Sequence, residues 1–134
     1  MKLNPNCIRA VLLAVESTCD MQHYFDSTED LDRIRGNFTL QEISYHARQC
    51  DLSGFLYHYE AHQGSLHFHV GDLTPAGHEF LEHIRNDSIW KSVLELSGKI
   101  GAKSLSAIAQ VAKMFISELI THQVSQMDLT QFLP

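Results

Sequence analysis

The strongest constraint on the fold is a helix start at Leu73-Thr74-Pro75, which follows a segment of alternating polarity. Thr74 is a suitable N-cap, and Pro75 fits the first helical turn because an N–H group there has no helical partner. Leu73 can pack against the start of this helix. The apolar stripe keeps helical spacing and continues past an expected bend near Asn86–Ser88. Its members are Phe80, Leu81, Ile84, Ile89, Trp90, Val93 and Leu94. The sequence therefore predicts a bent amphipathic helix after a β-hairpin.

The alternating segment, residues 55–70, predicts a hairpin with a two-residue turn at Gln63-Gly64. This register pairs His58 with His69 and Glu60 with His67. One face is then apolar and carries Tyr57, Tyr59, Ala61, Leu66, Phe68 and Val70. The other face carries His58, Glu60, His62, Ser65, His67 and His69. A slip of one residue would exchange the faces, so their clean segregation favours this register.

Four further helices are expected. Asn4 and Pro5 start the first, which ends near Ser17–Cys19, and a short helix spans Ser27–Arg35 with Ser27 or Thr28 as its cap. A capping box, Thr39 to Glu42, starts a helix over Leu40–Cys50 that stops before Gly54. After a break at Gly98–Lys103, Ser104 can cap a last helix with a broad apolar face. That face holds Leu105, Ile108, Ala109, Ala112, Phe115, Ile116, Leu119 and Ile120.

This order predicts an α+β fold: a winged helix-turn-helix with a two-stranded β-hairpin wing and an additional C-terminal helix. Residues 1–97 form the winged helix-turn-helix domain, 98–122 the C-terminal helix, and 123–134 a tail. The 134 residues contain no apolar run near the roughly 20 residues that a membrane span needs. The first residues lack the apolar core of a signal peptide. We therefore expect a cytoplasmic protein that does not contact membranes.

Several strings in this chain resemble a known family. Leu73-Thr74, Gly77-His78-Glu79-Phe80-Leu81, Ile84-Arg85, Asp87 and Trp90 are similar to the signature of the phage and bacterial family called domain of unknown function 2513. The opening Met1-Lys2-Leu3, Ile8-Arg9 and the string Ile43-Ser44-Tyr45-His46 are similar too. The resemblance implies a winged-helix-like fold and an origin in a phage or mobile element. It implies no catalytic residue, cofactor or substrate.

In a winged helix that reads DNA, the helix over Leu40–Cys50 would enter the major groove and the hairpin tip would be the wing. The candidate nucleic-acid-binding residues are Gln41, Ser44, Tyr45, Arg48, Gln49, Gln63 and Ser65. Gln and Arg side chains can make paired hydrogen bonds to adenine and guanine. The leading hypothesis is therefore a small DNA-binding regulatory protein.

The charge opposes this hypothesis. The net charge is −6, and residues 40–70 carry one arginine against three carboxylates. DNA-binding surfaces normally show the reverse. The alternative is an acidic winged-helix protein that binds another protein without reading DNA, for example an inhibitor of a host defence or transcription component.

The hairpin histidines suggest a metal site. Paired residues on adjacent strands have Cβ atoms about 5 Å apart, so His58 and His69 could share Zn²⁺ or Ni²⁺, with Glu60 or His67 as a third ligand. The alternatives are a polar solvent-facing surface, or a pH-sensitive one that gains charge on mild acidification. The spacing lacks the regularity of strong metal motifs, so no cofactor is expected.

No enzyme activity is expected. His78-Glu79 and His83 lack a nearby nucleophile or Gly-rich loop. The cysteines Cys7, Cys19 and Cys50 form no C-x-x-C pair, and we interpret them as small buried hydrophobic residues.

The last helix is apolar over much of its circumference, which indicates burial on several sides. Either it closes the core against the first helix, or it forms a homodimer interface. The candidate interface residues are Leu105, Ile108, Ala112, Phe115 and Leu119.

Overall fold

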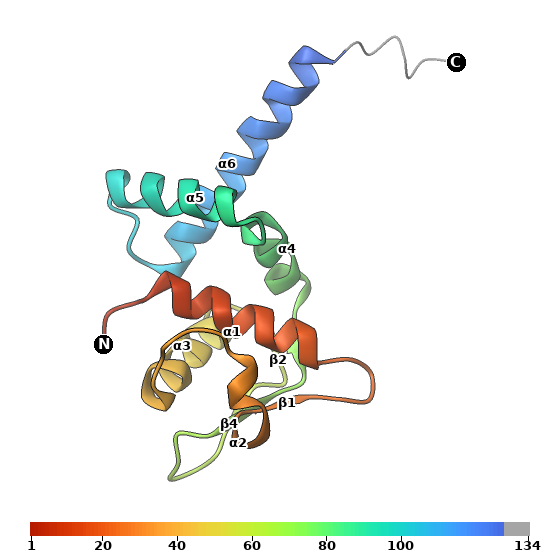
Figure 1. Cartoon of the computed structure of the whole chain (residues 1–134), viewed down its shortest axis with the longest axis vertical. Coiled ribbons are helices and arrows are strands. Elements are labelled where there is room, and N and C mark those ends of the chain that lie inside the picture. The colour runs from red at the N-terminus through yellow and green to blue at the C-terminus, as the bar shows by residue number, and fades with distance from the viewer. Residues whose placement is uncertain (128–134) are drawn as a thin grey trace.

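Helices dominate the structure, a computed structural model that describes residues 1–127, and short antiparallel strands complete an α+β fold (Figure 1). The predicted fold class is confirmed at this level. In chain order the elements are α1 (Pro5–Thr18), β1 (Phe25–Asp26), α2 (Ser27–Asp30), η1 (Leu31–Arg33), α3 (Leu40–Leu52), β2 (Leu56–Tyr57), β3 (Glu60–Ala61), β4 (Phe68–Val70), β5 (Asp72–Leu73), α4 (Pro75–Ile84), α5 (Asp87–Ile100) and α6 (Leu105–Gln126).

Most helix starts follow the predicted caps. Asn4 caps α1, Thr39 and Glu42 form the capping box of α3, and Thr74 caps α4. The predicted short helix is present as α2 followed by η1, but its predicted cap was wrong: Asp26 caps α2, accepting a hydrogen bond from the Thr28 N–H at 2.9 Å. That bond is the main reason why the pKa of Asp26 is lowered. Ser27 cannot serve as the cap because it is buried, and its hydroxyl accepts from the Phe68 N–H instead.

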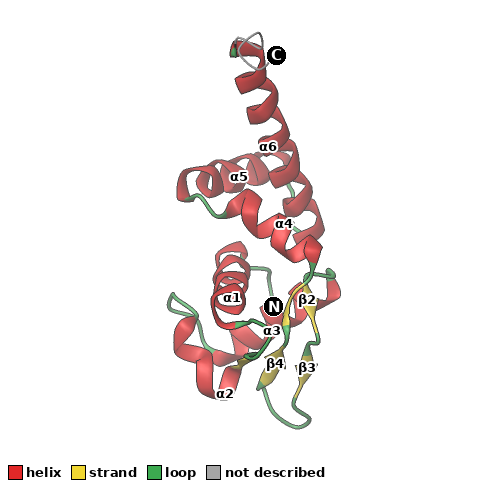
Figure 2. Cartoon of the chain, turned by 90° about the vertical axis from the view of Figure 1, so that its right-hand side faces the viewer, coloured by secondary structure: helices red, strands yellow, loops and turns green. Residues whose placement is uncertain are grey.

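The strands form a three-stranded sheet of order β1-β4-β3 and a two-stranded sheet of β2 and β5 (Figure 2). In the larger sheet, β1 pairs with β4, and Phe25 lies opposite Val70. In the chain β1 directly precedes α2. β1 is not predictable from the sequence, because two residues are too few to show an alternating pattern. The pairing brings the start of α2 against the hairpin.

The predicted hairpin register is wrong by two residues. Ala61 pairs with Phe68 and Glu60 with His69, and the His62 N–H donates to the His67 carbonyl at 2.8 Å. The two-residue turn predicted at Gln63-Gly64 needs a positive φ at its first central position in both favoured forms, but Gln63 does not adopt one and only Gly64 does, at +73°. A longer turn forms instead. A shift by two residues keeps each side chain on its face, so Phe68 and Val70 are buried as predicted.

A kink at His58 divides the first hairpin strand into β2 and β3. His58 has a φ of +53°, and the Gly71 N–H opposite donates to the carbonyls of both Tyr57 and His58. The kink ends the predicted alternation: Leu56 is buried and Tyr57 is 56% exposed. Two other members of the predicted apolar face, Ala61 and Leu66, are also exposed because they lie next to or in the wider turn.

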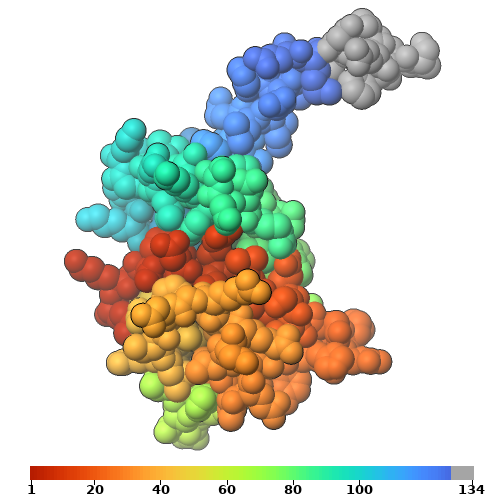
Figure 3. All heavy atoms as spheres, in the orientation of Figure 1, coloured from red at the N-terminus to blue at the C-terminus, as the bar shows by residue number. Residues whose placement is uncertain are grey.

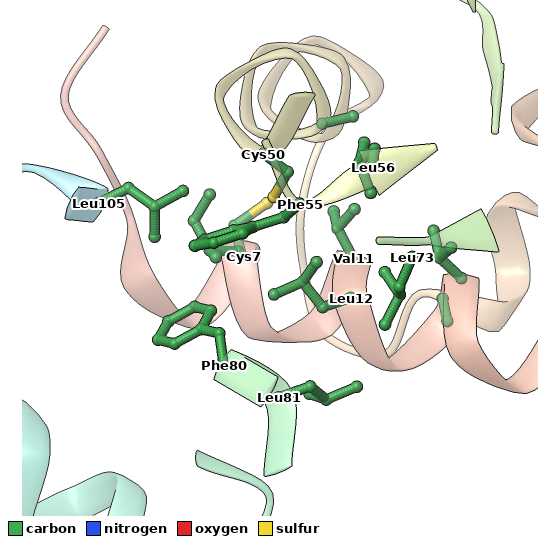
Figure 4. Packing of buried hydrophobic residues seen from close by; sticks show 14 of the residues in the cluster. Cys7, Val11, Leu12, Cys50, Phe55, Leu56, Leu73, Phe80, Leu81 and Leu105 are labelled. Carbon is green, nitrogen blue, oxygen red and sulfur yellow. The ribbon is translucent and has the colours of Figure 1, made fainter. Parts of the chain in front are cut away.

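The core is built around α1. Cys7, Ile8, Val11 and Leu12 are fully buried, and they meet apolar side chains from α3, β2, β5, α4 and the start of α6 (Figure 4). In Figure 4 the sulfur of Cys7 points toward that of Cys50 on α3. Burial of each large apolar side chain contributes about 1.5–3 kcal/mol of transfer free energy. This apolar contact fixes α3 and the hairpin relative to α1.

The C-terminal helices depart from the prediction in extent. The bend is confirmed: α4 ends at Ile84 and Asn86 caps α5. However, α5 continues through Gly98 to Ile100 and so crosses the boundary expected at residues 97–98. Among the helices of residues 1–127, none combines the length and apolar character needed to cross a membrane.

The first half of α6 packs mainly on α4 and α5, not on α1 as one alternative expected. Leu105, Ile108 and Ala112 are at most 5% exposed. These three residues therefore cannot form the predicted dimer interface while the monomer is folded. The second half of α6 extends away from the rest of the described chain (Figure 1). It includes residues 123–126 of the predicted tail, and positions 128–134 of that tail lie outside the described residues.

Candidate nucleic-acid interface

The solvent-facing side of α3 carries the five helix residues predicted to contact DNA. Gln41 and Arg48 are exposed, and Ser44, Tyr45 and Gln49 are half-buried. Their spacing places them on one side of the helix. The opposite side is buried against α1 and holds Ile43, His46, Ala47 and Cys50. The structure thus brings these five predicted residues together on an open surface.

His46 is a polar anchor of α3 that the sequence analysis did not identify. Its side chain is 1% exposed, Nε2 accepts from the Asn4 N–H at 2.7 Å, and Nδ1 lies 2.7 Å from the Glu42 carbonyl. The carbonyl can only accept, so Nδ1 carries the proton and the ring is the neutral tautomer. The helical spacing of His46 with Ile43, Ala47 and Cys50 was the available signal. The bond from Asn4 ties α3 to the start of α1, and the bond to Glu42 holds the ring in place within α3.

The hairpin turn supplies the other two predicted residues, Gln63 and Ser65, and both are exposed. The Ser65 hydroxyl accepts from the His67 N–H at 3.0 Å, which orders the turn. Figure 2 shows this turn at the end of the molecule opposite to α6. Because β2 follows α3 and packs on it, the hairpin is positioned directly by α3.

Only two of the four residues of the predicted metal site, Glu60 and His69, are brought together. His69 Nε2 lies 3.3 Å from Glu60 Oε2, and its Nδ1 lies 3.1 Å from His62 Nε2. His67 instead contacts the Ser27 hydroxyl at 2.9 Å. His58 lies at the kink and its ring packs against Tyr57.

The predicted pairing of His58 with His69 was therefore wrong, because the register is shifted and the strand is kinked. Among residues 1–127, no group of three or more His, Cys, Asp or Glu side chains could hold a metal ion.

The cysteine thiols are held in the neutral form. Burial raises the pKa of Cys7 to about 12 and that of Cys19 to about 11, and it raises the pKa of Cys50 as well. A thiol reacts as a nucleophile only when it is ionised. At neutral pH these side chains act as small apolar residues, as predicted for Cys7 and Cys50, which are fully buried.

The residues that carried the family resemblance meet where α1 contacts the junction of α4 and α5. Arg9 Nε donates to the Ile84 carbonyl at 3.0 Å, and Arg9 Nη2 donates to the Arg85 carbonyl and to Asp87 Oδ1. The same guanidinium lies 5.9 Å from the ring centre of Trp90. Trp90 in turn donates to Asn6 Oδ1 at 2.9 Å.

A second part of the resemblance is also structural. At Gly77 a Cβ atom would lie 2.3 Å from the Phe55 carbonyl oxygen, so α4 can approach the hairpin this closely only with glycine. Phe80, Leu81 and Ile84 are buried in the core. Most of these signature residues thus hold the fold together, whereas Ser44 and Tyr45 belong to the solvent-facing polar row on α3.

Comparison with known proteins identifies relatives of this chain. The family described as "Hypothetical protein (DUF2513)" matches residues 2–104. A protein of Haemophilus influenzae named "Uncharacterized protein" is 31% identical over 122 residues, which cover 90% of this chain and 99% of that protein. No solved structure matches significantly. The family match covers most of the chain and includes every element from α1 to α5, and on this basis the chain belongs to the DUF2513 family.

Proposed function

We propose that this protein is a winged-helix regulatory protein that binds duplex DNA, with α3 as the reading helix and the hairpin as the wing. The observation that carries the proposal is the row of hydrogen-bonding side chains on the open side of α3. Gln41 and Arg48 suit adenine and guanine edges, respectively. The order helix, strand, two helices and hairpin, with β1 paired to β4, is consistent with this family of domains.

The charge of this surface indicates weak, salt-sensitive binding. Arg48 is its single arginine or lysine, and Glu42, Asp51 and Glu60 lie on the same elements or next to them. Each phosphate contact contributes about −0.9 to the slope of log affinity against log salt. We therefore expect a small slope and measurable binding chiefly at low ionic strength. Base contacts would carry a larger share of the affinity than in a basic DNA-binding domain.

The test is a titration of labelled duplex DNA followed by fluorescence anisotropy at low salt. Arg48→Gln should weaken binding by about tenfold or more, since a good arginine–base contact is worth about 1–3 kcal/mol. Lys99→Gln is the matched control, because it removes one exposed positive charge from α5, away from α3. No binding by the wild-type protein, or equal losses in both variants, would contradict the proposal.

The acidic charge favours a second candidate, in which the same side of α3 binds another protein. In that case duplex DNA would not bind, and a basic partner would be favoured by the net charge of −6. Purification of complexes from the native host with wild-type protein and with Arg48→Gln separates the two candidates. A partner protein that is retained after nuclease treatment and lost by the variant supports the second candidate.

We also propose that the second half of α6 pairs with the same segment of another copy. Met114, Leu119, Ile120 and Val124 are each at least 37% exposed there. Phe115, which was predicted for the interface, is half-buried at the edge of this segment. Residues 113–126 carry one lysine and one glutamate, so two copies can approach without the repulsion expected between chains of charge −6. A homodimer would present two copies of α3 to a two-fold symmetric DNA site.

A further inference from the structure

We infer that the groove between α1, the loop from η1 to α3, and the junction of α4 and α5 binds an acidic peptide segment of a partner protein. Four of the chain's five arginines line this groove: Arg9, Arg33, Arg35 and Arg85. Glu16 is the single carboxylate among the lining residues of the described chain. The cavity volume is about 660 Å³. A protein of net charge −6 thus concentrates most of its guanidinium groups at one place.

Two of these arginines are held in fixed positions by the fold. Arg9 is fixed by the carbonyls of Ile84 and Arg85 and by Asp87. Arg85 binds Glu16 through two nitrogens, at 2.9 and 2.5 Å, and Glu82 at 2.8 Å. Side chains that are already ordered lose little further entropy when a ligand binds. The paired hydrogen bonds from Arg85 to Glu16 also show that a carboxylate is accommodated inside the groove.

The other two arginines lie at the end of η1 and on the loop that follows it, and Arg35 supplies the free binding capacity of the groove. Arg33 is half-exposed and lies 3.2 Å from Asp30, and Arg35 is exposed and forms no ion pair with residues 1–127. Gly36 fixes the path of this loop: its φ is +126°, and a Cβ atom there would lie 2.4 Å from the Phe38 ring. In Figure 3 the orange-to-gold surface of the loop lies against the red surface of α1.

One part of the lining between the arginines is apolar, and this decides the class of ligand. It is formed by Ala10, Leu13, Ala14 and Phe38, while Asn6 and Ser17 add polar groups. A groove with an apolar wall and guanidinium groups at its rim fits carboxylates that flank an apolar side chain. The sugar–phosphate backbone of a nucleic acid has no apolar side chain to place against this wall. An acidic protein segment is therefore favoured over DNA or RNA.

The groove is separate from the surface proposed to bind DNA. Arg48 is the one arginine that does not line it, and none of the candidate DNA-binding residues does. On α1 the groove uses Asn6, Ala10 and Leu13, whereas Cys7 on another side of this helix contacts the Glu42 carbonyl of α3. The inference therefore does not depend on DNA binding. Both surfaces can be tested on the same protein.

The experiment is a titration of the full chain with a synthetic peptide rich in Glu and Asp that contains one Phe and no Trp. Trp90 is the chain's single tryptophan and lies beside Arg9, so its fluorescence reports on the groove. We expect saturable binding at low salt. The same peptide with Gln and Asn in place of Glu and Asp should bind at least about tenfold more weakly, because charge-assisted bonds are lost.

The decisive variants are Arg33→Gln/Arg35→Gln and, as a control of equal charge, Arg48→Gln/Lys99→Gln. The first pair should weaken peptide binding by about tenfold and leave duplex DNA binding unchanged, whereas the control should retain peptide binding. The single variant Arg35→Gln is a control in case the double variant misfolds. Arg35 forms no ion pair with the described residues, so its replacement should not disturb the fold. Failure to bind the peptide would overturn the inference, as would equal losses in both pairs. Stronger binding of an oligodeoxythymidylate with the same dependence on Arg33 and Arg35 would assign the groove to nucleic acid and also overturn it.

Discussion

At Gly77 the first turn of α4 contacts the backbone at the start of the hairpin. A Cβ atom there would lie 2.3 Å from the Phe55 carbonyl, which a rigid backbone cannot accommodate. We expect Gly77→Ala to lower the free energy of unfolding by about 2–3 kcal/mol. Gly98→Ala is the matched control: Gly98 lies inside α5 with nothing within 4 Å of its Cβ position, so alanine should stabilise by about 0.5–1 kcal/mol. Denaturant unfolding of both variants checks this, and equal effects would contradict the packing at Gly77.

Arg9 connects α1 to the junction of α4 and α5 through a geometry that lysine cannot reproduce. Its planar guanidinium group donates to the carbonyls of Ile84 and Arg85 and to Asp87, and its side chain is 17% exposed. We expect Arg9→Lys to lower the free energy of unfolding by about 1.5–3 kcal/mol, because a hydrogen bond to a charged group contributes about this much. Arg33→Lys, at a half-exposed ion pair with Asp30, should change it little. An Arg9→Lys variant with an unchanged free energy of unfolding would show that the hydrogen bonds of Arg9 do not stabilise the fold.

Single residues also show where prediction from sequence succeeds. Asn4, Thr39 and Thr74 were predictable as caps because their action is local, involving N–H groups two or three residues away. His46 was not predictable in the same way, since its partner Asn4 is 42 residues distant in the chain. The positive φ of His58 likewise accompanies a contact that is distant in the chain, the hydrogen bonds from the Gly71 N–H to Tyr57 and His58.

At the scale of elements, periodicity predicted each long helix but not the hairpin register. Helical stripes on α1, α3 and α4 follow from burial on one side, and all three are present. The hairpin instead depends on the turn, and the turn between His62 and His67 is wider than the two-residue form. The metal site was predicted from that register, and the changed pairing brings Glu60 to His69 but leaves His58 and His67 apart from them.

The two halves of α6 have different surroundings, and the difference gives a test of dimerisation. Residues up to Ala112 are buried on α4 and α5, and Ile120 is 58% exposed. We expect the wild-type chain to sediment as a dimer and Ile120→Glu as a folded monomer, because a charge is not accommodated in an apolar interface. Leu96→Glu, at a 38% exposed apolar residue of α5, should remain a dimer. A wild-type chain that sediments as a monomer at high concentration would contradict the pairing of α6.

At the scale of the whole molecule, the distribution of charge distinguishes two surfaces. The arginine groove draws residues from α1, the loop before α3, and the end of α4, so no local motif could predict it. The α3 surface comes from one continuous segment, and its five predicted residues could be assigned from helical spacing alone. The hairpin turn adds Gln63 and Ser65 at the end of the molecule away from α6 (Figure 2).

The most direct test of the proposed function is to map duplex DNA onto the protein by amide NMR shifts at low salt. If α3 and the hairpin bind DNA, the largest shifts should fall at Gln41, Ser44, Tyr45, Arg48 and Gln49 and at the turn around Gln63. These shifts should all decrease as salt is added, because phosphate contacts weaken with increasing salt concentration. Shifts confined to the arginine groove, or no shifts at any DNA concentration, would contradict the account.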